Sequence, residues 1–272
     1  MTKKKRTWIF TLLALLIAAL HISPFYIMIN MSLKTLSDRS SRWMPALHPH
    51  FENYVTAMEH GNLMSAMWNT FQITVLSVII IVVAGAMAAY PLARKASRKN
   101  QIILTFIVGV MMVPQLSILV PLYKEMVTLK GINKLWGIVI VSATFHLPMA
   151  IYMYSNFIRS IPKELDEAAM IDGCSRMQAF FQVILPCLKS TTVSVIILNG
   201  VGIWNDYQFQ LYFLQKPAMR TITLAISTFF TDSKQDLGAA AAAAFIVVLP
   251  PVLIYIFLQK YFVKGAMDSA VK

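Results

Sequence analysis

Charged side chains are scarce in this sequence. Asp, Glu, Lys and Arg make up 13% of the 272 residues and hydrophobic residues 57%, and the mean hydropathy is +0.63. Soluble domains contain about 25% charged and about 45–50% apolar residues, so this balance excludes an ordinary soluble domain. Because several apolar runs are long enough to cross a hydrocarbon core of about 30 Å, the sequence predicts an all-α polytopic membrane protein.

Cysteines and common catalytic patterns are also rare. The two cysteines, Cys174 and Cys187, allow at most one disulfide, and we expect free thiols because both fall in a segment predicted to face the reducing cytoplasm. None of the ten glycines precedes a lysine, which excludes a Gly-x-x-x-x-Gly-Lys phosphate loop in this chain. The His and Cys residues lack partners at metal-ligand or nucleophile spacing. We therefore expect no enzyme activity, catalytic residue, cofactor or metal site.

The hydrophobic runs predict six membrane-spanning helices within a single domain that covers residues 1–272. The predicted spans are residues 8–28, 69–90, 102–122, 135–158, 191–213 and 240–262. Helix-breaking residues interrupt several of these runs: Pro24, Pro114, Pro148, Gly200, Gly202, Pro250 and Pro251. They predict kinked helices in a packed bundle, where neighbouring helices satisfy the freed backbone groups. The alternative is that proline is simply more frequent in membrane helices than in soluble ones.

Basic residues set the expected orientation of the chain. With the N-terminus inside, 15 of the 24 Lys and Arg residues fall on the cytoplasmic side, as the positive-inside rule requires. Both termini are therefore predicted to be cytoplasmic. The net charge of +12 comes from basic residues beside apolar runs, so we expect no nucleic-acid binding. The first run has features of a signal peptide, but it continues to Met28 without a convincing small-residue cleavage site, which favours a retained helix.

Residues 159–190 are too polar to insert and carry two short amphipathic helical patterns. Acidic residues near the first pattern's start complement the positive end of a helix dipole. Gly173 lies where a helix can end in a left-handed conformation, and Ser175 with Gln178 forms a capping box that opens the next helix. Pro186 is expected to end or kink that second helix. The pattern predicts a capped helix-turn-helix suited to docking another protein, the alternative being a loop that lies on the membrane surface.

Three blocks of this segment resemble the EAA loop of the transmembrane subunits of ABC importers. They are Glu167-Ala168-Ala169, Asp172-Gly173 and Ile184-Leu185-Pro186. Over nearly its whole length the chain resembles the carbohydrate-uptake permeases of the maltose type, and in particular the six-helix, shorter partner of the permease pair. Further matching blocks are residues 89–94, 160–165, 204–206 and 249–251 and the tail from residue 259. Ser190 departs from the family, which often has a proline there.

The resemblance implies a permease that works with several other proteins. In such importers an extracytoplasmic solute-binding protein delivers solute to two homologous permease subunits, and two cytoplasmic ATPase subunits drive alternating access. The chain is then a multi-pass protein of the bacterial cytoplasmic (inner) membrane, in contact with lipid. The resemblance places the ATPase-coupling helix at Glu167, Ala168, Ala169, Asp172 and Gly173. Glu167 would offer a charge, the alanines would allow close approach and Gly173 would make the turn.

A polar cluster in the fifth predicted span is the candidate translocation pathway. It consists of Trp204, Asn205, Asp206, Tyr207 and Gln208. Asp206 is the acidic residue that falls within a predicted span, and a carboxylate there is costly enough to indicate a function. Aromatic faces with amide and carboxylate groups suit the C–H and hydroxyl groups of a sugar. The alternative is a structural Asp206 near the outer membrane surface.

These patterns together predict a subunit that translocates a sugar or oligosaccharide. The same machinery moving a polyol, glycerol phosphate or uronide is an alternative that the residues do not exclude. A self-contained secondary carrier is the alternative from another class, but such carriers usually show internal repeats and more ion-coordinating groups at mid-membrane. The outer segments, residues 31–68 and 214–238, are the expected contact for the solute-binding protein.

Overall fold

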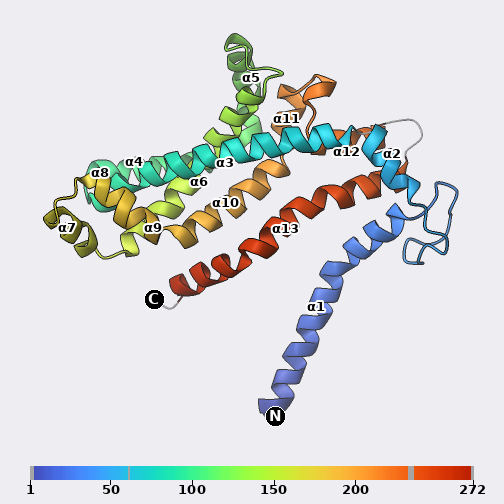
Figure 1. Ribbon diagram of the computed structural model, residues 1–272, viewed down its shortest axis with the longest axis horizontal. Coiled ribbons are helices and arrows are strands. Elements are labelled where there is room, and N and C mark those ends of the chain that lie inside the picture. The colour runs from blue at the N-terminus through green and yellow to red at the C-terminus, as the bar shows by residue number, and fades with distance from the viewer. Residues whose placement is uncertain (1–2, 61, 232–235, 271–272) are drawn as a thin grey trace. The chain divides into compact units, whose positions relative to one another are not determined.

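The regular elements that the structure describes are helices, so the expected all-α fold is confirmed. The computed structural model describes residues 3–60, 62–231 and 236–270 (Figure 1). In chain order the elements are α1 (Lys3–Ser32), α2 (Glu52–His60), α3 (Leu63–Arg94), α4 (Arg98–Val110), η1 (Gln115–Ile118), α5 (Leu119–Thr128), α6 (Leu135–Ser160), α7 (Glu164–Ile171), α8 (Arg176–Ala179), η2 (Phe180–Ile184), α9 (Leu185–Cys187), α10 (Lys189–Trp204), α11 (Gln208–Phe213), η3 (Pro217–Met219), α12 (Ile222–Thr231) and α13 (Leu237–Ala270).

Four of these helices are long and apolar enough to cross a membrane. Their spanning parts are Trp8–Ser32, Leu63–Arg94, Leu135–Ser160 and Leu237–Lys260. Two bent helix pairs raise the number to six if each pair forms one span: Arg98–Val110 with Gln115–Thr128, and Arg176–Cys187 with Lys189–Trp204. The chain is therefore a polytopic helical membrane protein, and the count of six spans stays a prediction.

The third predicted span, residues 102–122, is not one straight helix. α4 ends at Val110, and the helical residues that follow are bent away from it by 90°. Pro114 lies in the break, where its ring removes a backbone N–H and disfavours helical geometry in the residue before it. Pro24 and Pro148, by contrast, lie inside the continuous helices α1 and α6. A proline in an apolar run thus breaks the helix at one of these positions but not at the others.

The fifth predicted span, residues 191–213, is also interrupted. α10 ends at Trp204 and α11 begins at Gln208. The intervening Asn205 returns its side-chain N–H to the carbonyl oxygen of Val201 at 2.9 Å, which competes with a continued helix as Asn side chains commonly do. Before α10 the chain bends by 73° between the helical segment Arg176–Cys187 and α10. The bend comes shortly after Pro186, where the sequence predicted an end or a kink.

Residues 1–64 and 224–250 form one compact unit. Asn53 of α2 is buried in this unit and donates from Nδ2 to the carbonyl oxygen of Lys34 at 2.8 Å. Gly238, near the start of α13, approaches so closely that an added Cβ would lie 2.6 Å from the same Nδ2 atom. A buried amide and a glycine therefore join α2, the chain after α1 and the beginning of α13.

Residues 65–223 and 251–272 form the second compact unit. α6 packs against α10, and α3 runs beside both (Figure 1). Tyr154 of α6 is buried and donates to Thr192 Oγ1 of α10 at 3.0 Å. Gly85 of α3 lies so close to α6 that an added Cβ would be 3.1 Å from an alanine Cβ there. Small residues and buried hydroxyls thus allow close helix packing, as is usual in membranes.

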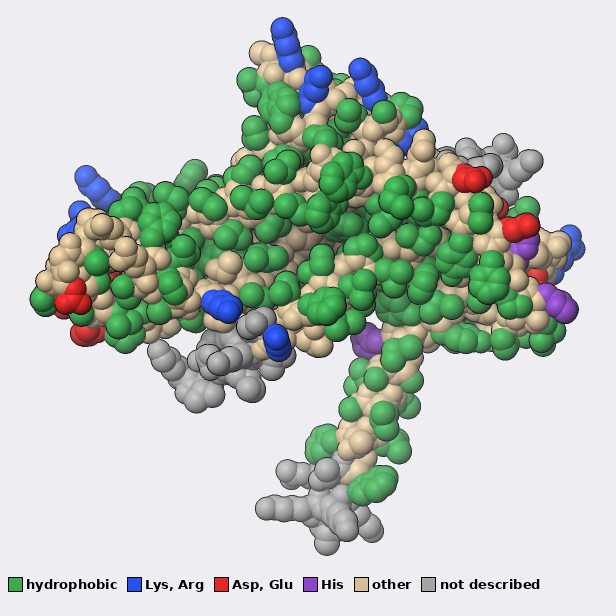
Figure 2. All heavy atoms as spheres, in the orientation of Figure 1, with side chains coloured by type: hydrophobic (Ala, Val, Ile, Leu, Met, Phe, Trp, Pro, Cys, Tyr) green, Lys and Arg blue, Asp and Glu red, His purple; other side chains and the backbone are tan. Residues whose placement is uncertain are grey.

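Apolar side chains cover much of the visible surface of the helices (Figure 2). Charged side chains in the same view are few and lie in small groups. An apolar surface of this extent is unusual for a soluble monomer, whereas lipid or a partner helix would cover it.

Candidate functional site

The helix-turn-helix predicted for residues 159–190 is present. α7 ends in a complete Schellman motif, because Gly173 N–H bonds to Met170 O at 3.1 Å and Cys174 N–H bonds to Ala169 O at 2.9 Å. Gly173 has φ +90°, a conformation that favours glycine. Apart from the adjoining residues, no atom of the described chain lies within 4 Å of a Cβ added there. The glycine is therefore required by backbone conformation rather than by crowding.

The predicted capping box opens the second helix. Ser175 Oγ accepts from Gln178 N–H at 3.3 Å, and Gln178 Oε1 accepts from Ser175 N–H at 2.8 Å. Further along, Leu185 N–H bonds to the carbonyl oxygen of Phe180, five residues back. This single π-helical turn directly precedes Pro186. Reciprocal capping and the Schellman motif satisfy the backbone groups on both sides of the turn, which fixes the geometry of the helix pair.

Asp166 of α7 anchors the helix pair to the end of α3. Its Oδ1 accepts from Tyr90 Oη at 2.5 Å, and its Oδ2 lies 2.7 Å from Arg94 Nη2. The side chains of Arg94 and Asp166 are only 12% and 9% exposed. The two charges of a pair this deeply buried attract each other more strongly than charges at the surface. If one partner is removed, the other is left as an uncompensated buried charge.

Arg94 also binds the end of α6. Its Nη1 donates to the carbonyl oxygens of Ile158 at 3.0 Å and Ile161 at 2.7 Å. Carbonyl groups at the end of a helix lack partners within the helix. The guanidinium supplies a donor to two of them, of which Ile158 O also accepts from Ile161 N–H at 3.2 Å, while its second terminal nitrogen, Nη2, pairs with Asp166. One side chain therefore connects the ends of α3, α6 and α7.

Aromatic and small residues complete the inner face of the helix pair. The ring of Tyr90 packs on Phe180 with a centroid distance of 5.0 Å. Phe180 is buried, as are Ala169, Ala179 and Ile184. Asp166, Tyr90 and Arg94 were not among the predicted site residues. The sequence signal for Tyr90 and Arg94 was the family motif at residues 89–94, but the motif does not indicate that these residues contact Asp166.

The outer face of α7 carries most of the predicted coupling residues. Glu167, Ala168, Asp172 and Gly173 are exposed, whereas Ala169 faces inward with Asp166. Apolar residues share the exposed side, and Ile171 is 86% exposed. Beside the helix lies a cavity of about 400 Å³, bordered by Tyr90, Pro91, Arg94, Lys95, Lys163, Asp166, Glu167, Met170 and Arg176. The outer face thus combines the carboxylates of Glu167 and Asp172 with exposed apolar groups, as protein-binding surfaces often do.

The predicted pathway residues do not converge on one polar cavity. Trp204 is buried at the end of α10, while Asn205, Tyr207 and Gln208 are exposed in and after the break. The Asp206 carboxylate interacts with backbone N–H groups in the first turn of α11. Its Oδ2 is nevertheless buried without a hydrogen-bond partner among the described residues. The side chain therefore helps to organise the start of α11 and keeps one unsatisfied oxygen.

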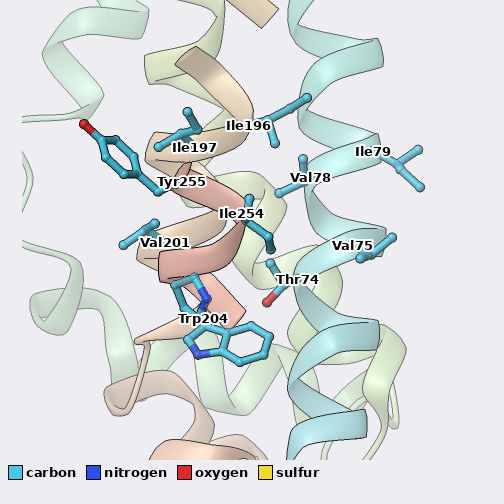
Figure 3. Close-up of a pocket in the computed structure, with 12 residues that line it drawn as sticks. Thr74, Val75, Val78, Ile79, Ile196, Ile197, Val201, Trp204, Ile254 and Tyr255 are labelled. Atoms are coloured by element: carbon cyan, nitrogen blue, oxygen red, sulfur yellow. The ribbon is translucent and has the colours of Figure 1, made fainter. Parts of the chain in front are cut away.

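Trp204 lines an apolar cavity instead (Figure 3). This cavity of about 180 Å³ lies between residues of α3, α10 and α13, including Val78, Ile197 and Ile254. Thr74 adds the hydroxyl group that points inward near the indole in Figure 3, and its Oγ1 has no partner among the described residues. Such a lining suits packing or an apolar group rather than a sugar, whose hydroxyls need several donors and acceptors.

Known proteins resemble this chain in sequence and fold. The family described as "Binding-protein-dependent transport system inner membrane component" matches residues 81–267. The melibiose/raffinose/stachyose import permease protein MelC of Bacillus subtilis is 39% identical over 272 residues, which cover 100% of this chain and 98% of that protein. The probable starch degradation products transport system permease protein AmyC of Thermoanaerobacterium thermosulfurigenes is 33% identical over 97% of each chain.

A solved structure shares the fold. It is a chain of a bacterial ABC transporter involved in the import of the acidic polysaccharide alginate. The two chains superpose with a TM-score of 0.81 at 19% sequence identity, over 96% of this chain and 99% of that one. At this identity the likeness extends to the arrangement of the helices.

Proposed function

We infer the function from the premise that the chain belongs to the family of binding-protein-dependent transport system inner membrane components. The family is a transport permease component and not an enzyme, and the chain is a membrane permease of the sugar ABC importer type. We propose that it translocates a sugar or oligosaccharide by alternating access, and that ATP is hydrolysed by two separate cytoplasmic ATPase subunits.

The observation that carries the proposal is the anchored helix pair of α7 and α8. Its inner face is fixed by the Asp166 ion pair and the Tyr90–Phe180 contact, and its outer face is unoccupied among the described residues. A rigid element of this kind can transmit force from a partner to the ends of α3 and α6. We assign the ATPase contact to Glu167, Ala168, Asp172 and Gly173, with Ala169 acting from the inner side by permitting close packing.

The proposed assembly contains a second homologous permease subunit and an extracytoplasmic solute-binding protein. One structure that shares the fold is a bacterial alginate ABC transporter in complex with an alginate pentasaccharide-bound periplasmic protein, which supports a partner of this kind. The segments 31–68 and 214–238 are assigned to that contact. The proposed setting is the bacterial inner membrane, with six spans in a single transmembrane domain and both termini cytoplasmic.

The solute class rests on the sugars and starch products named for the relatives. A polyol, glycerol phosphate or uronide carried by the same machinery is the alternative.

Asp206 and its neighbours Trp204, Asn205, Tyr207 and Gln208 are proposed to border the solute path. Uptake by Asp206→Asn, compared with Glu125→Gln as an exposed acid elsewhere, tests this part. Normal uptake by the well-expressed Asp206→Asn protein would assign Asp206 to structure alone.

Co-purification from the native membrane tests the coupling assignment. The tagged chain is extracted in mild detergent and its partners are identified by mass spectrometry, for the native chain, Gly173→Asp and the control Thr128→Asp. We expect an ATPase and a second permease with the native chain and the control. Gly173→Asp should insert normally but lose the ATPase and solute uptake, because it adds a charge and strains a positive φ. A folded, active chain that purifies alone would instead indicate a secondary carrier.

A further inference from the structure

A third cavity, near the end of α3, the start of α4 and the end of α6, has an unusual charge balance. It measures about 270 Å³ and is bordered by the cationic residues Arg94, Lys95, Arg159 and Lys163 together with Asn100 and Gln101. The described residues that line it include no Asp or Glu. Three cations other than the paired Arg94 therefore surround a space large enough for a phosphate group, and the lining itself contains no carboxylate. Two of them, Lys95 and Lys163, also border the neighbouring cavity that Asp166 and Glu167 line.

Three of the four cations are available for a ligand. The Arg94 guanidinium is engaged by Asp166 and by carbonyl groups at the end of α6. Lys95, Arg159 and Lys163 are exposed, and in the described parts of the chain none of them forms an ion pair. Like charges held close together repel, and a bound anion removes that repulsion. We propose that this cavity binds the phosphate head group of an anionic glycerophospholipid.

The position of the cavity favours a lipid over a soluble anion. α3 ends at Arg94 and α6 at Ser160, and both helices are long and apolar enough to cross a membrane. α4 then begins at Arg98 as the first half of a bent pair. The cavity therefore lies where spans leave the hydrocarbon core, which is the depth of lipid head groups, and basic pockets between helices at this level bind anionic head groups.

Apolar residues beyond the cavity provide a surface for acyl chains. α4 contributes Asn100 and Gln101 to the cavity and over its next two turns presents Ile102 and Phe106, which are 61% and 70% exposed. A polar cavity continued by an apolar helix surface matches the two chemical parts of a phospholipid. Inorganic phosphate would use the first part only.

Native mass spectrometry of the full-length chain in mild nonionic detergent tests the proposal. The probes are dioleoyl-phosphatidylglycerol, dioleoyl-phosphatidylcholine and inorganic phosphate. We expect selective retention of phosphatidylglycerol. The triple variant Lys95→Gln/Arg159→Gln/Lys163→Gln should lose about fivefold in affinity for each cation removed, or about 100-fold in total. Size-exclusion chromatography and circular dichroism check that each variant is folded.

Two further variants separate a specific site from a general charge effect. The control Lys124→Gln/Lys216→Gln/Arg220→Gln also removes two lysines and one arginine, but from exposed positions elsewhere in the chain. It should bind phosphatidylglycerol as the native chain does. Lys95→Arg/Arg159→Lys/Lys163→Arg keeps the charges and should retain binding even if the glutamine variant fails to fold.

Three outcomes would overturn the proposal. The first is equal loss of binding in the two glutamine variants, and the second is equal retention of phosphatidylcholine. The third is displacement of phosphatidylglycerol by millimolar inorganic phosphate, which would assign the cavity to a soluble anion. Because the readout is lipid binding, none of these results depends on the transport function.

Discussion

Removing the charge of Asp166 should release α7 from the end of α3. In Asp166→Asn the amide oxygen can still accept from Tyr90, but the buried Arg94 loses its counter-ion. Removing one partner of a buried ion pair costs about 3–5 kcal/mol. Arg94 keeps its two bonds to the carbonyl oxygens of Ile158 and Ile161, so we take the lower end, about 3 kcal/mol. This corresponds to an increase of about 100-fold in local opening.

Hydrogen exchange measures this opening directly. The backbone N–H groups of α7 and of the turn at Gly173 should exchange about 100-fold faster in Asp166→Asn, while those in the middle of α6 should change little. Glu164→Gln is the matched control, because it makes the same chemical change on an exposed side chain of the same helix. Exchange in Asp166→Asn within about threefold of that control would refute the reasoning that the ion pair holds α7 in place.

A double-mutant cycle separates the pair from its surroundings. Arg94→Met alone leaves the Asp166 carboxylate buried with only the Tyr90 hydroxyl, so it should destabilise α7 as well. Combining Arg94→Met with Asp166→Asn removes both charges, and the double variant should be more stable than the sum of the two single effects predicts. Additive effects would mean that the two side chains act independently.

Three smaller changes probe other contacts of the fold. Tyr90→Phe removes a hydrogen bond to a charged group and should cost about 1.5–3 kcal/mol of α7 docking, again measured by hydrogen exchange; no change would place the hydroxyl outside the anchor. Ser175→Ala should destabilise the start of α8 by about 1 kcal/mol, because it removes one half of the capping box. In a Cys187→Ser background, maleimide should then label Cys174 faster, and an unchanged labelling rate would contradict this. Asn53→Ala leaves buried carbonyl groups unsatisfied at a cost of about 1–3 kcal/mol each, and the thermal unfolding midpoint should fall clearly below that of the exposed control Thr35→Ala.

Local features of the helix pair could be predicted from the sequence, whereas its attachment could not. The turn at Gly173 and the capping box of Ser175 and Gln178 depend on residues within a few positions of each other, so their spacing alone indicates them. Asp166, by contrast, is held by residues far away in the sequence, and its partner Tyr90 lies 76 positions earlier. Nothing in the acidic start of α7 distinguishes the buried Asp166 from its exposed neighbours, because the distinction arises only when α3 and α7 meet.

The spans show the same division between local and distant causes. Four of the predicted runs lie within the continuous helices α1, α3, α6 and α13, which extend beyond them. The breaks near Pro114 and at Asn205 fall within runs whose hydropathy is continuous enough to suggest one helix each. Pro114 and the Asn205-Asp206 pair were visible in the sequence as helix-breaking and turn-forming residues. The bend of 90° at the first break, however, depends on packing partners that hydropathy does not record.

The anchor also determines how a force on α7 would travel under the proposed function. A push on the exposed outer face could be absorbed if α7 slid along the ends of the spans. Sliding would separate Arg94 from Asp166 and Tyr90 from Phe180, and it would leave a buried charge unpaired at a cost of several kcal/mol. Moving the ends of α3 and α6 together with α7 preserves every one of these contacts. The lower-energy response is therefore a joint movement, and the short contacts around Arg94 are what would convert a local push into a displacement of two membrane spans.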